Sequence, residues 1–229
     1  MKNKFVAFNL FPVILILLSF LFPGHKTSPT PEEPIPSAIF SGSVSPVNGN
    51  QSAKMLETGS WKQGCPIAIN DLRVVSVSFW DFDGDQQEGE IMVHKDVADD
   101  VLEVFQTLYD SKYPIKRIEL VDNYDADDEL SMQADNTSGF NCRLVPNTKV
   151  WSEHAYGKAI DLNPFENPEV RNGKVDPIGA ERYKNRSLND IGMIKPDDAA
   201  IQAFASIGWK WGGNWTALKD YQHFSLNGK

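Results

Sequence analysis

The sequence is consistent with an α+β domain, because strand-like and helix-like segments alternate along most of the chain. Residues 72–80 alternate apolar and polar side chains, which is the period of a half-buried strand. Residues 96–112 and 196–207 carry helical signals, and Gly208 ends the second of these segments. We therefore predict strands near 72–80, 90–94, 115–121 and 159–163, and helices near 96–112 and 196–207.

Residues 1–22 predict a targeting segment. Lys2 and Lys4 precede an apolar run over residues 11–22, an arrangement typical of a signal peptide or an N-terminal membrane anchor. No small-x-small cleavage site follows the run, and its length is near the lower limit for spanning a bilayer. We expect an exported protein that is periplasmic, in the cell envelope or secreted, with a membrane tether through residues 5–22 as the alternative.

Residues 23–55 predict a disordered linker. This segment is rich in proline and serine and holds few large apolar residues. Such a composition buries too little surface to offset the entropy of ordering the chain. The folded domain is therefore expected to span residues 56–229, with the folded part starting near Trp61. Its length is sufficient for a single hydrophobic core.

The charge of the chain excludes one class of partner. The formal net charge is −9, and no basic patch is evident along the sequence. Because binding to phosphate backbones needs clustered lysine and arginine, we expect no nucleic-acid partner. We expect the domain to be a monomer.

Three acidic or glycine-rich segments between the predicted elements predict loops. Residues 81–85 contain an Asp-Gly pair, which favours a hairpin turn over the calcium loop that they faintly resemble. The acidic run 122–129 is typical of a solvated loop, with a calcium-type site as the alternative. Residues 169–195 predict a long loop that forms the wall or lid of a cleft.

The chain has two cysteines, Cys65 and Cys142. In an exported protein an even pair is a disulfide candidate, and the alternative is two free buried thiols. A disulfide would close a loop of about 78 residues, which contributes up to about 4.5 kcal/mol in the chain-entropy model. It would also join the start of the domain to the segment that carries Arg143.

Two histidines and an aspartate suggest a metal site. His154 and Asp161 flank a glycine and a short apolar run that predicts a buried strand, and His223 lies near the C-terminus. Two neutral imidazoles and one carboxylate suit zinc with a fourth position open to water. Asp220 could then accept a proton from that water. By spacing alone, these residues are also compatible with ordinary structural roles.

The order of these residues resembles a family. The pattern Ser-x-His-x-x-Gly-x-Ala-x-Asp at residues 152–161, followed by Asp-x-x-His at 220–223, is similar to the zinc peptidases that cut bacterial cell-wall stem peptides. That family includes D-alanyl-D-alanine carboxypeptidases, the D,D-dipeptidases of vancomycin resistance and L-alanyl-D-glutamate endopeptidases. The similarity extends over roughly residues 61 to 225 and includes segments 136–143 and 208–215.

The resemblance implies a fold and a metal site. The expected fold is Hedgehog/DD-peptidase-like, with a small antiparallel sheet flanked by helices and the metal in an open cleft. One Zn2+ per domain would be held by His154, Asp161 and His223, and Asp220 would be the general base. An aspartate in this place matches the branch that contains L-alanyl-D-glutamate endopeptidases, whereas the vancomycin-resistance branch uses glutamate.

The resemblance also implies which residues contact substrate. Arg143 matches an arginine that contacts the substrate and the tetrahedral intermediate, a role suited to its planar fork of donors. Ser152 and Asn141 match positions that line the same cleft. Some of the tryptophans in segment 208–215 would line the cleft near His223.

The resemblance predicts a zinc metallopeptidase that hydrolyses peptidoglycan stem peptides, most specifically an L-Ala–D-Glu endopeptidase. A D-alanyl-D-alanine carboxypeptidase is the alternative within the same class. A non-catalytic zinc-bearing domain that binds the cell wall is an alternative of another class, and a tethered structural protein of the envelope is a third. Loss of the base or the arginine would mark the binding domain, and this chain has both Asp220 and Arg143.

Overall fold

The computed structural model describes residues 39–229. The predicted signal or anchor segment 1–22 and residues 23–38 of the predicted linker lie outside the described residues. Ala38–Lys229 forms one compact unit. Within the described residues, no helix is both long and apolar enough to cross a membrane.

The folded domain begins earlier than the sequence predicts. Strand β1 (Gly42–Pro46) and helix α1 (Gly49–Thr58) lie where a disordered linker was expected up to residue 55. Asn48 and Gln51 cap the start of α1 reciprocally, each side chain accepting the other residue's N–H. The linker prediction is therefore wrong for this part, because strand pairing and capping order a segment that has little apolar content.

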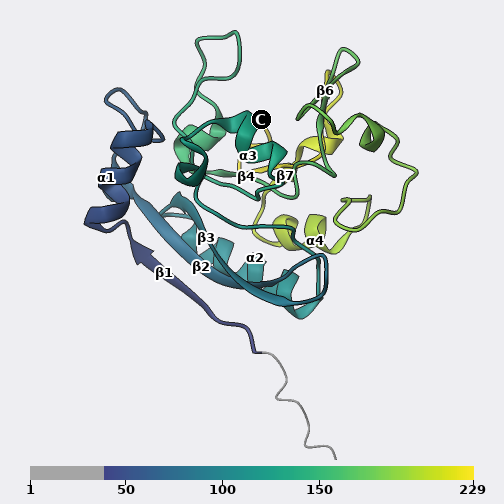
Figure 1. The fold of residues 1–229 in the computed structure, drawn as a ribbon, viewed down its shortest axis with the longest axis horizontal. Helices are drawn as coiled ribbons and strands as arrows, with labels where there is room; N and C mark the ends of the chain where they lie inside the picture. Colours follow the sequence, from purple (N-terminus) through teal and green to yellow (C-terminus); the bar gives the residue numbers. More distant parts are fainter. Residues whose placement is uncertain (1–38) are drawn as a thin grey trace, which may run out of the picture. The chain divides into compact units, whose positions relative to one another are not determined.

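The first sheet has the antiparallel order β1–β2–β3 (Figure 1). Strands β2 (Leu72–Trp80) and β3 (Gln86–His94) form the expected hairpin, and the Asp81 carboxylate accepts two main-chain N–H groups in its turn. Helix α2 (Ala98–Asp110) lies against this sheet and buries an apolar stripe in the main core. These elements confirm the α+β class.

Residues 115–121 do not form the predicted strand. The N–H groups of Lys116 and Glu119 donate to the side-chain oxygens of Asn163 and Asn136, at 3.0 and 2.8 Å. Side-chain amides thus satisfy a backbone that a neighbouring strand would otherwise pair. In this segment every third side chain is buried, at Ile115, Ile118 and Val121, without a ladder of hydrogen bonds.

A second sheet carries two of the proposed metal ligands. Its strands follow the antiparallel order β4–β9–β7 and span Ala159–Asp161, His223–Ser225 and Lys210–Trp211. Helix α4 (Ala199–Ser206) packs behind it, with the Phe204 ring stacked on Phe224 at 4.2 Å between centroids. Both the strand and the helix predicted in these segments are present, with shorter bounds than predicted.

A third sheet replaces the first part of the predicted long loop. Its order is β6–β5–β8, and these strands span Lys174–Asp176, Glu169–Arg171 and Lys219–Asp220. The prediction of a loop over 169–195 is therefore wrong at its start, where β5 and β6 form a hairpin. Backbone pairing with β8 stabilises this polar hairpin. Because the hairpin contains no apolar run, the sequence pattern did not predict it.

Short helical turns fill most of the remaining connections. The acidic run forms the turn η2 (Val121–Tyr124) and the start of helix α3 (Asp128–Gln133), whose N-cap is Asp127. The other turns are η1 (Ile69–Asp71), η3 (Glu153–Tyr156), η4 (Glu181–Lys184) and η5 (Gly212–Asn214). Of these, η3 and η5 hold parts of the site described next.

Candidate metal centre and cleft

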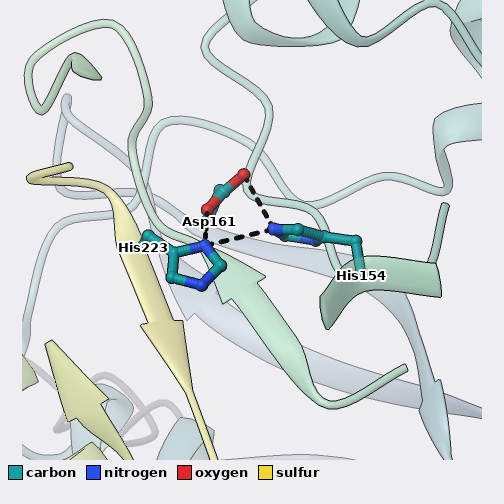
Figure 2. A group of neighbouring side chains, drawn as sticks. All are labelled: His154, Asp161 and His223. Atoms are coloured by element: carbon teal, nitrogen blue, oxygen red, sulfur yellow. Dashed lines mark hydrogen bonds and ion pairs between the residues drawn. The ribbon is translucent and has the colours of Figure 1, made fainter. Parts of the chain in front are cut away.

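His154, Asp161 and His223 meet at one point (Figure 2). His154 Nε2 lies 3.1 Å from Asp161 Oδ2, and His223 Nδ1 lies 3.0 Å from Asp161 Oδ1. The two ring nitrogens are 3.3 Å apart. All three side chains are buried, each at 5% exposure or less. The three residues predicted as a metal-ligand set are thus brought together.

Local structure explains this convergence. Asp161 and His223 are direct partners in the β4–β9 register, so their side chains project on the same side of the sheet. His154 lies in the turn η3, which begins where Ser152 Oγ accepts the His154 N–H. Gly157 ends that turn at φ +64°, and a Cβ there would lie 2.6 Å from the main-chain nitrogen of His94. Only glycine allows this close approach.

The second nitrogen of each imidazole lies within hydrogen-bond distance of a main-chain oxygen. His154 Nδ1 lies 2.6 Å from the Gly139 oxygen, and His223 Nε2 lies 3.0 Å from the Lys229 oxygen. Main-chain oxygens only accept, so with a metal bound these nitrogens would carry the hydrogens of the neutral rings. The remaining two nitrogens then present lone pairs to the same point as the Asp161 carboxylate. This donor set fits zinc, whose histidine ligands are fixed in this way.

The charges of the three residues depend on one another. Burial opposes a charge on His154, but the Asp161 carboxylate outweighs it and raises the pKa of His154 above its ordinary value. Burial likewise opposes the charge on Asp161, and the two imidazoles reverse this and hold the pKa of Asp161 well below its usual range. Asp161 is therefore ionised, as a metal ligand must be.

Asp220 lies beside the ligand group in strand β8. Its Oδ1 atom is buried and has no hydrogen-bond partner among the described residues. Burial raises the pKa of Asp220 to about 8, with the Asp161 and Glu169 carboxylates adding to the rise against the opposing effect of His223 and Arg143. In the metal-free protein this carboxyl group is therefore protonated at neutral pH, and it can act as a base only once a nearby positive charge lowers its pKa.

A glycine permits Asp220 to lie this close to the ligands. A Cβ on Gly212, in the turn η5, would lie 2.6 Å from the Asp220 carbonyl oxygen and 3.3 Å from the His223 Cβ. Any side chain there would push both residues away from the packed turn. The glycine pair in segment 208–215 thus sets how closely η5 approaches the site.

Arg143 lines one cleft together with Asp220 and the three candidate ligands. Its Nη2 atom lies 2.8 Å from Asp128 Oδ2, and its Nε atom is buried without a partner among the described residues. Asp128 is the first residue of helix α3. The guanidinium therefore enters the cleft with one edge held by a carboxylate.

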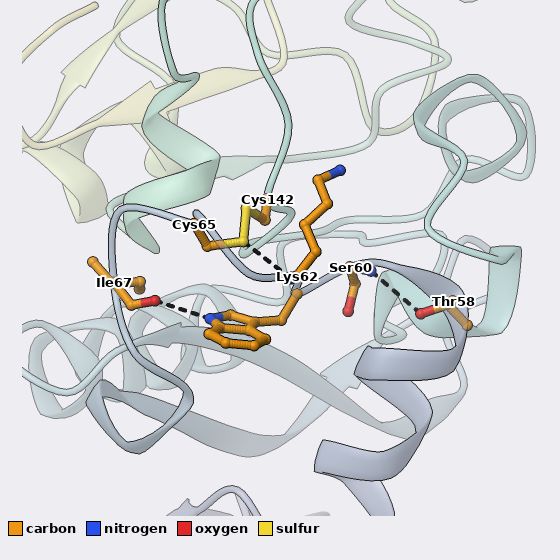
Figure 3. Close-up of a disulfide and its surroundings, with 7 residues drawn as sticks. Thr58, Ser60, Lys62, Cys65, Ile67 and Cys142 are labelled. Carbon is orange, nitrogen blue, oxygen red and sulfur yellow. Dashed lines mark hydrogen bonds between the residues drawn. A yellow bond between two sulfur atoms is a disulfide. The ribbon is translucent and has the colours of Figure 1, made fainter.

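A disulfide anchors the segment that precedes Arg143 (Figure 3). Cys65 and Cys142 are bonded across a sequence separation of 77 residues, so the predicted disulfide is present and the alternative of two free thiols is not. The Cys142 N–H also donates to the Ser60 carbonyl at 2.9 Å, and the Trp61 indole donates to the Ile67 carbonyl at 2.9 Å. These contacts fix the chain on the N-terminal side of Arg143.

The comparison with known families covers the part of the chain that holds the ligand group. Residues 146–226 match the family model described as D-alanyl-D-alanine carboxypeptidase. Members of that family are zinc peptidases of the cell wall. Residues 146–226 therefore support a metal-dependent hydrolase that acts on peptidoglycan, and the His-Asp-His group is compatible with its metal. Comparisons with curated proteins and with solved structures gave no match.

This match confirms, for the matched residues, the family that the sequence motifs resemble. The matched peptidase segment contains all three candidate ligands and Asp220, whereas Arg143 lies just before its start. The family therefore supports the metal chemistry directly. The assignment of Arg143 depends on its position in the cleft.

A cleft of about 570 Å³ runs over the ligand group. One wall is the loop between Arg143 and Ser152, and the other is the β5–β6 hairpin, which rises on the right of Figure 1. The volume lies within the usual range of ligand sites, ~300–1,000 Å³. The cleft reaches Arg143, Ser152, Asp220 and all three candidate ligands. The expectation of a cleft wall in residues 169–195 therefore agrees with the structure.

Asn141 does not line this cleft. Its side chain is buried at 3% exposure and donates to the Ala126 carbonyl at 3.3 Å. It holds the acidic segment in place and does not face substrate, because its amide is needed to satisfy that carbonyl. Of the two residues predicted to bind substrate, only Ser152 lines the cleft.

Two neighbours of the site are absent from the sequence predictions. Asp128 pairs with Arg143, and the Lys229 carbonyl accepts from His223. Asp128 lies in the acidic run at a helix start, where an exposed charge is the usual interpretation. A main-chain acceptor such as Lys229 has no sequence signature. Trp215 does line the cleft, with its ring centroid 5.3 Å from that of His223.

Proposed function

We propose that this protein is a zinc-dependent endopeptidase that cuts the L-Ala–D-Glu bond of peptidoglycan stem peptides. The observation that carries the proposal is the convergence of His154, Asp161 and His223 beside the unpartnered Asp220 oxygen. A Hedgehog/DD-peptidase-like fold with the metal in an open cleft belongs to the same proposal. Because peptidoglycan lies outside the cytoplasm, the proposal includes export of the protein.

His154 Nε2, Asp161 and His223 Nδ1 would hold the zinc ion. When bound, zinc supplies a Lewis acid that lowers the pKa of water and polarises a carbonyl. A cation at this place also favours the charged form of nearby Asp220 and so lowers its pKa below the value of the metal-free protein. Asp220 is then ready to accept a proton.

Asp220 takes the proton from the attacking water, using the oxygen that has no partner in the protein. The same carboxyl group returns the proton to the leaving amine when the peptide bond breaks. Burial keeps other proton donors away from this carboxyl group, so the proton stays available for the amine.

Arg143 stabilises the negative charge that develops on the carbonyl oxygen of the substrate. Its guanidinium presents several N–H donors, and Asp128 occupies only one edge of the fork. Donors that are held in place before the reaction stabilise an oxyanion without reorganisation. Ser152 lies on the wall nearest His154 and contacts the bound peptide.

Two observations favour an internal bond as the point of cleavage. The base is an aspartate, as in the endopeptidase branch that the sequence resembles. The cleft runs between two separate walls, the loop between Arg143 and Ser152 and the β5–β6 hairpin, which leaves room for peptide on both sides of the scissile bond. The printed description of the matching family favours the second candidate, a D-alanyl-D-alanine carboxypeptidase, which removes only a terminal residue.

Digestion of purified peptidoglycan by the full chain tests the proposal, with products identified by mass spectrometry. Reactions with zinc, with a chelator and with the Asp220→Ala variant are compared. New N-terminal D-Glu that disappears in the last two reactions is the expected result. Release of terminal D-Ala alone would support the carboxypeptidase. A folded, zinc-loaded protein that yields no zinc-dependent product would support the cell-wall binding domain.

A further inference from the structure

A second, smaller pocket adjoins the cleft at Trp215. It has a volume of about 310 Å³, and we call it the aromatic pocket after its lining residues Trp209, Trp211, Trp215 and Phe224. Trp215 lines both this pocket and the cleft over the ligand group. The centroid of its ring lies 5.3 Å from that of the His223 imidazole. The aromatic pocket is therefore a direct neighbour of the candidate metal centre.

One hydrogen-bond donor of the aromatic pocket has no partner. The Trp211 indole donates to the Tyr221 carbonyl at 2.8 Å, and the Trp215 indole donates to the Gly228 carbonyl at 2.9 Å. The indole nitrogen of Trp209 is buried and has no acceptor among the described residues. Because buried polar groups are nearly always hydrogen-bonded, this N–H needs an acceptor from outside the chain. An acceptor atom of a molecule bound in the pocket would meet that need.

The other lining residues indicate the class of that molecule. Lys210 and Asn214 are exposed and line the same pocket, so the aromatic rings are accompanied by further N–H donors. A sugar ring presents a face of C–H groups, which packs on aromatic rings, and an edge of hydroxyl oxygens. An acetamido group adds a carbonyl acceptor. The lining thus fits an N-acetylated sugar, and the volume is at the lower end of the usual range for ligand sites, ~300–1,000 Å³.

The proposed substrate carries such a sugar close to the bond that is cut. In peptidoglycan the L-Ala of the stem peptide is joined to N-acetylmuramic acid through a lactyl group. Cleavage after L-Ala therefore leaves about two residue lengths, roughly 7 Å, between the scissile carbonyl and the sugar. This span is similar to the 5.3 Å that separates the rings of His223 and Trp215. For removal of a terminal D-Ala, the sugar would lie several residues farther away.

We propose that the aromatic pocket binds an N-acetylated sugar of the glycan strand, next to the stem peptide in the cleft. This inference rests on the proposed function, because the L-Ala–D-Glu bond is the one that places the sugar beside Trp215. Trp209 donates to the acetamido oxygen, and Lys210 and Asn214 donate to oxygens at the edge of the ring. The remainder of the stem peptide occupies the larger cleft. The pocket thereby gives preference to stem peptides that are still attached to glycan.

A binding experiment tests the pocket without requiring hydrolysis. The metal-free full chain is titrated with the disaccharide of N-acetylglucosamine, and the indole N–H signals are followed by nitrogen-15 NMR. The signals of Trp209 and Trp215 are expected to shift. Maltose, which has no acetamido group, is expected to leave the Trp209 signal unchanged.

Two matched variants localise the binding. Ala205 is exposed on helix α4 and lines the pocket, so Ala205→Arg fills the pocket with a residue that favours the helix. Ser206→Arg adds the same side chain at the next position, which is also exposed but does not line the pocket. Ala205→Arg is expected to abolish the shifts, and Ser206→Arg to keep them. Asn214→Ala, at an exposed position, is expected to weaken binding and keeps the test available if Ala205→Arg does not fold.

A kinetic comparison tests the preference for attached peptides. The zinc-loaded chain is given the free stem tetrapeptide or the same peptide joined to its disaccharide. We expect kcat/KM to be at least ~10-fold higher for the disaccharide peptide, because binding of a remote part of the substrate contributes to catalysis. Ala205→Arg is expected to reduce this value to that of the free peptide, and Ser206→Arg to retain the preference.

The outcomes separate the pocket from the proposed function. Shifts and a kinetic preference that Ala205→Arg removes support the proposal. An unmodified chain that cuts the L-Ala–D-Glu bond but shows no shift with the disaccharide, or equal kcat/KM for the two substrates, overturns the role of the pocket and leaves the peptidase intact. Disaccharide binding by a chain that cuts neither substrate supports the sugar site and overturns the peptidase.

Discussion

Asp220 is the residue whose protonation differs most from that of an ordinary surface aspartate. Its pKa is about 8 in the folded, metal-free protein, against about 3.9 in an unfolded chain. The folded state therefore binds more protons between these values, and the free energy of unfolding falls as pH rises from about 4 to about 8. Above about pH 8 the buried carboxyl group is ionised, and this buried charge lowers the free energy of unfolding.

We expect Asp220→Asn to abolish hydrolysis and to stabilise the metal-free protein at high pH. Asparagine cannot take the proton and carries no charge to be buried, so activity should fall by roughly 10²–10⁴-fold. The melting temperature of the metal-free variant should exceed that of the unmodified protein at pH 9. Calorimetry at pH 5 and pH 9 checks this, since at pH 5 both carry a neutral group. An equal difference at the two pH values would contradict the assigned pKa.

The raised pKa of His154 gives zinc binding a pH dependence. Zinc needs the neutral imidazole, and the ion pair with Asp161 favours the protonated one. As pH falls through the pKa of His154, protons displace the metal, and the apparent Kd should rise by about tenfold per pH unit for each competing proton. Chelator competition between pH 5 and 8 measures this. A Kd that stays constant over that range would show that His154 is not a ligand.

Arg143 is expected to act on the rate and not on the metal. Lysine at this position keeps the charge but loses the planar fork, so Arg143→Lys should lower kcat by about 10²-fold, the usual effect of removing an oxyanion donor. Zinc affinity should not change. Arg171→Lys is the control, because Arg171 lines the same cleft but is held by two hydrogen bonds to Glu169. Equal losses in both variants would remove the special role of Arg143.

Most of the chemistry at the residue scale could be predicted from the sequence. The types and order of His154, Asp161, Asp220 and His223 suggested a metal site, and the resemblance to a zinc peptidase family then assigned a role to each of them. Asp128 could not be predicted, since its partner is distant in sequence and the residue resembles any acid at a helix start. Asn141 was assigned to the cleft by resemblance, and its burial could not be read from the sequence.

At the scale of elements, the disulfide offers the clearest measurable contribution. Cys65–Cys142 closes a long loop and joins the end of the α1 region to the residue before Arg143. We expect the Cys65→Ala/Cys142→Ala variant to lose about 2–4 kcal/mol of unfolding free energy in denaturant titrations. Zinc affinity of the folded variant should change little, because the ligands lie on other elements. A variant as stable as the unmodified chain would contradict this role.

Elements with clear hydrophobic periodicity were predicted well, and those held by backbone contacts were not. Strand β2 and helix α2 follow their apolar patterns. Strand β1, helix α1 and the β5–β6 hairpin are polar, and pairing or capping orders them. Residues 115–121 show the opposite error, because apolar side chains are buried there without forming a strand. Periodicity reports burial, and burial alone does not decide pairing.

At the scale of the whole described unit, the site combines two sheets. The ligands Asp161 and His223 belong to β4 and β9, whereas Asp220 belongs to β8, which pairs with the hairpin wall of the cleft. The register that brings Asp161 opposite His223 joins residues 62 positions apart. No local pattern encodes that register, and it could be inferred only through the family resemblance.

We expect the spacing between the sheets to be critical for catalysis. One residue inserted between Tyr221 and Gln222 should lower activity by at least ~10²-fold, because a misplacement of about 1 Å already has this effect. The same insertion after Asn172, in the turn between β5 and β6, should be tolerated, as exposed loop tips usually are. Peptidoglycan digestion by both variants provides the comparison. Equal activity of the two insertion variants would show that the distance between the two sheets does not depend on the length of the segment between Asp220 and His223.

The two residues between Asp220 and His223 therefore act as a ruler. They are the direct covalent link from the sheet that carries the base to the sheet that carries the ligands. The Gln222 carbonyl accepts from Leu162, and the Tyr221 N–H donates to the Pro168 carbonyl, so the link is held at both residues. The hairpin wall can vary in length and charge to suit different peptides while this short stretch keeps its length. Substrate preference and catalytic distance can thus change separately during evolution.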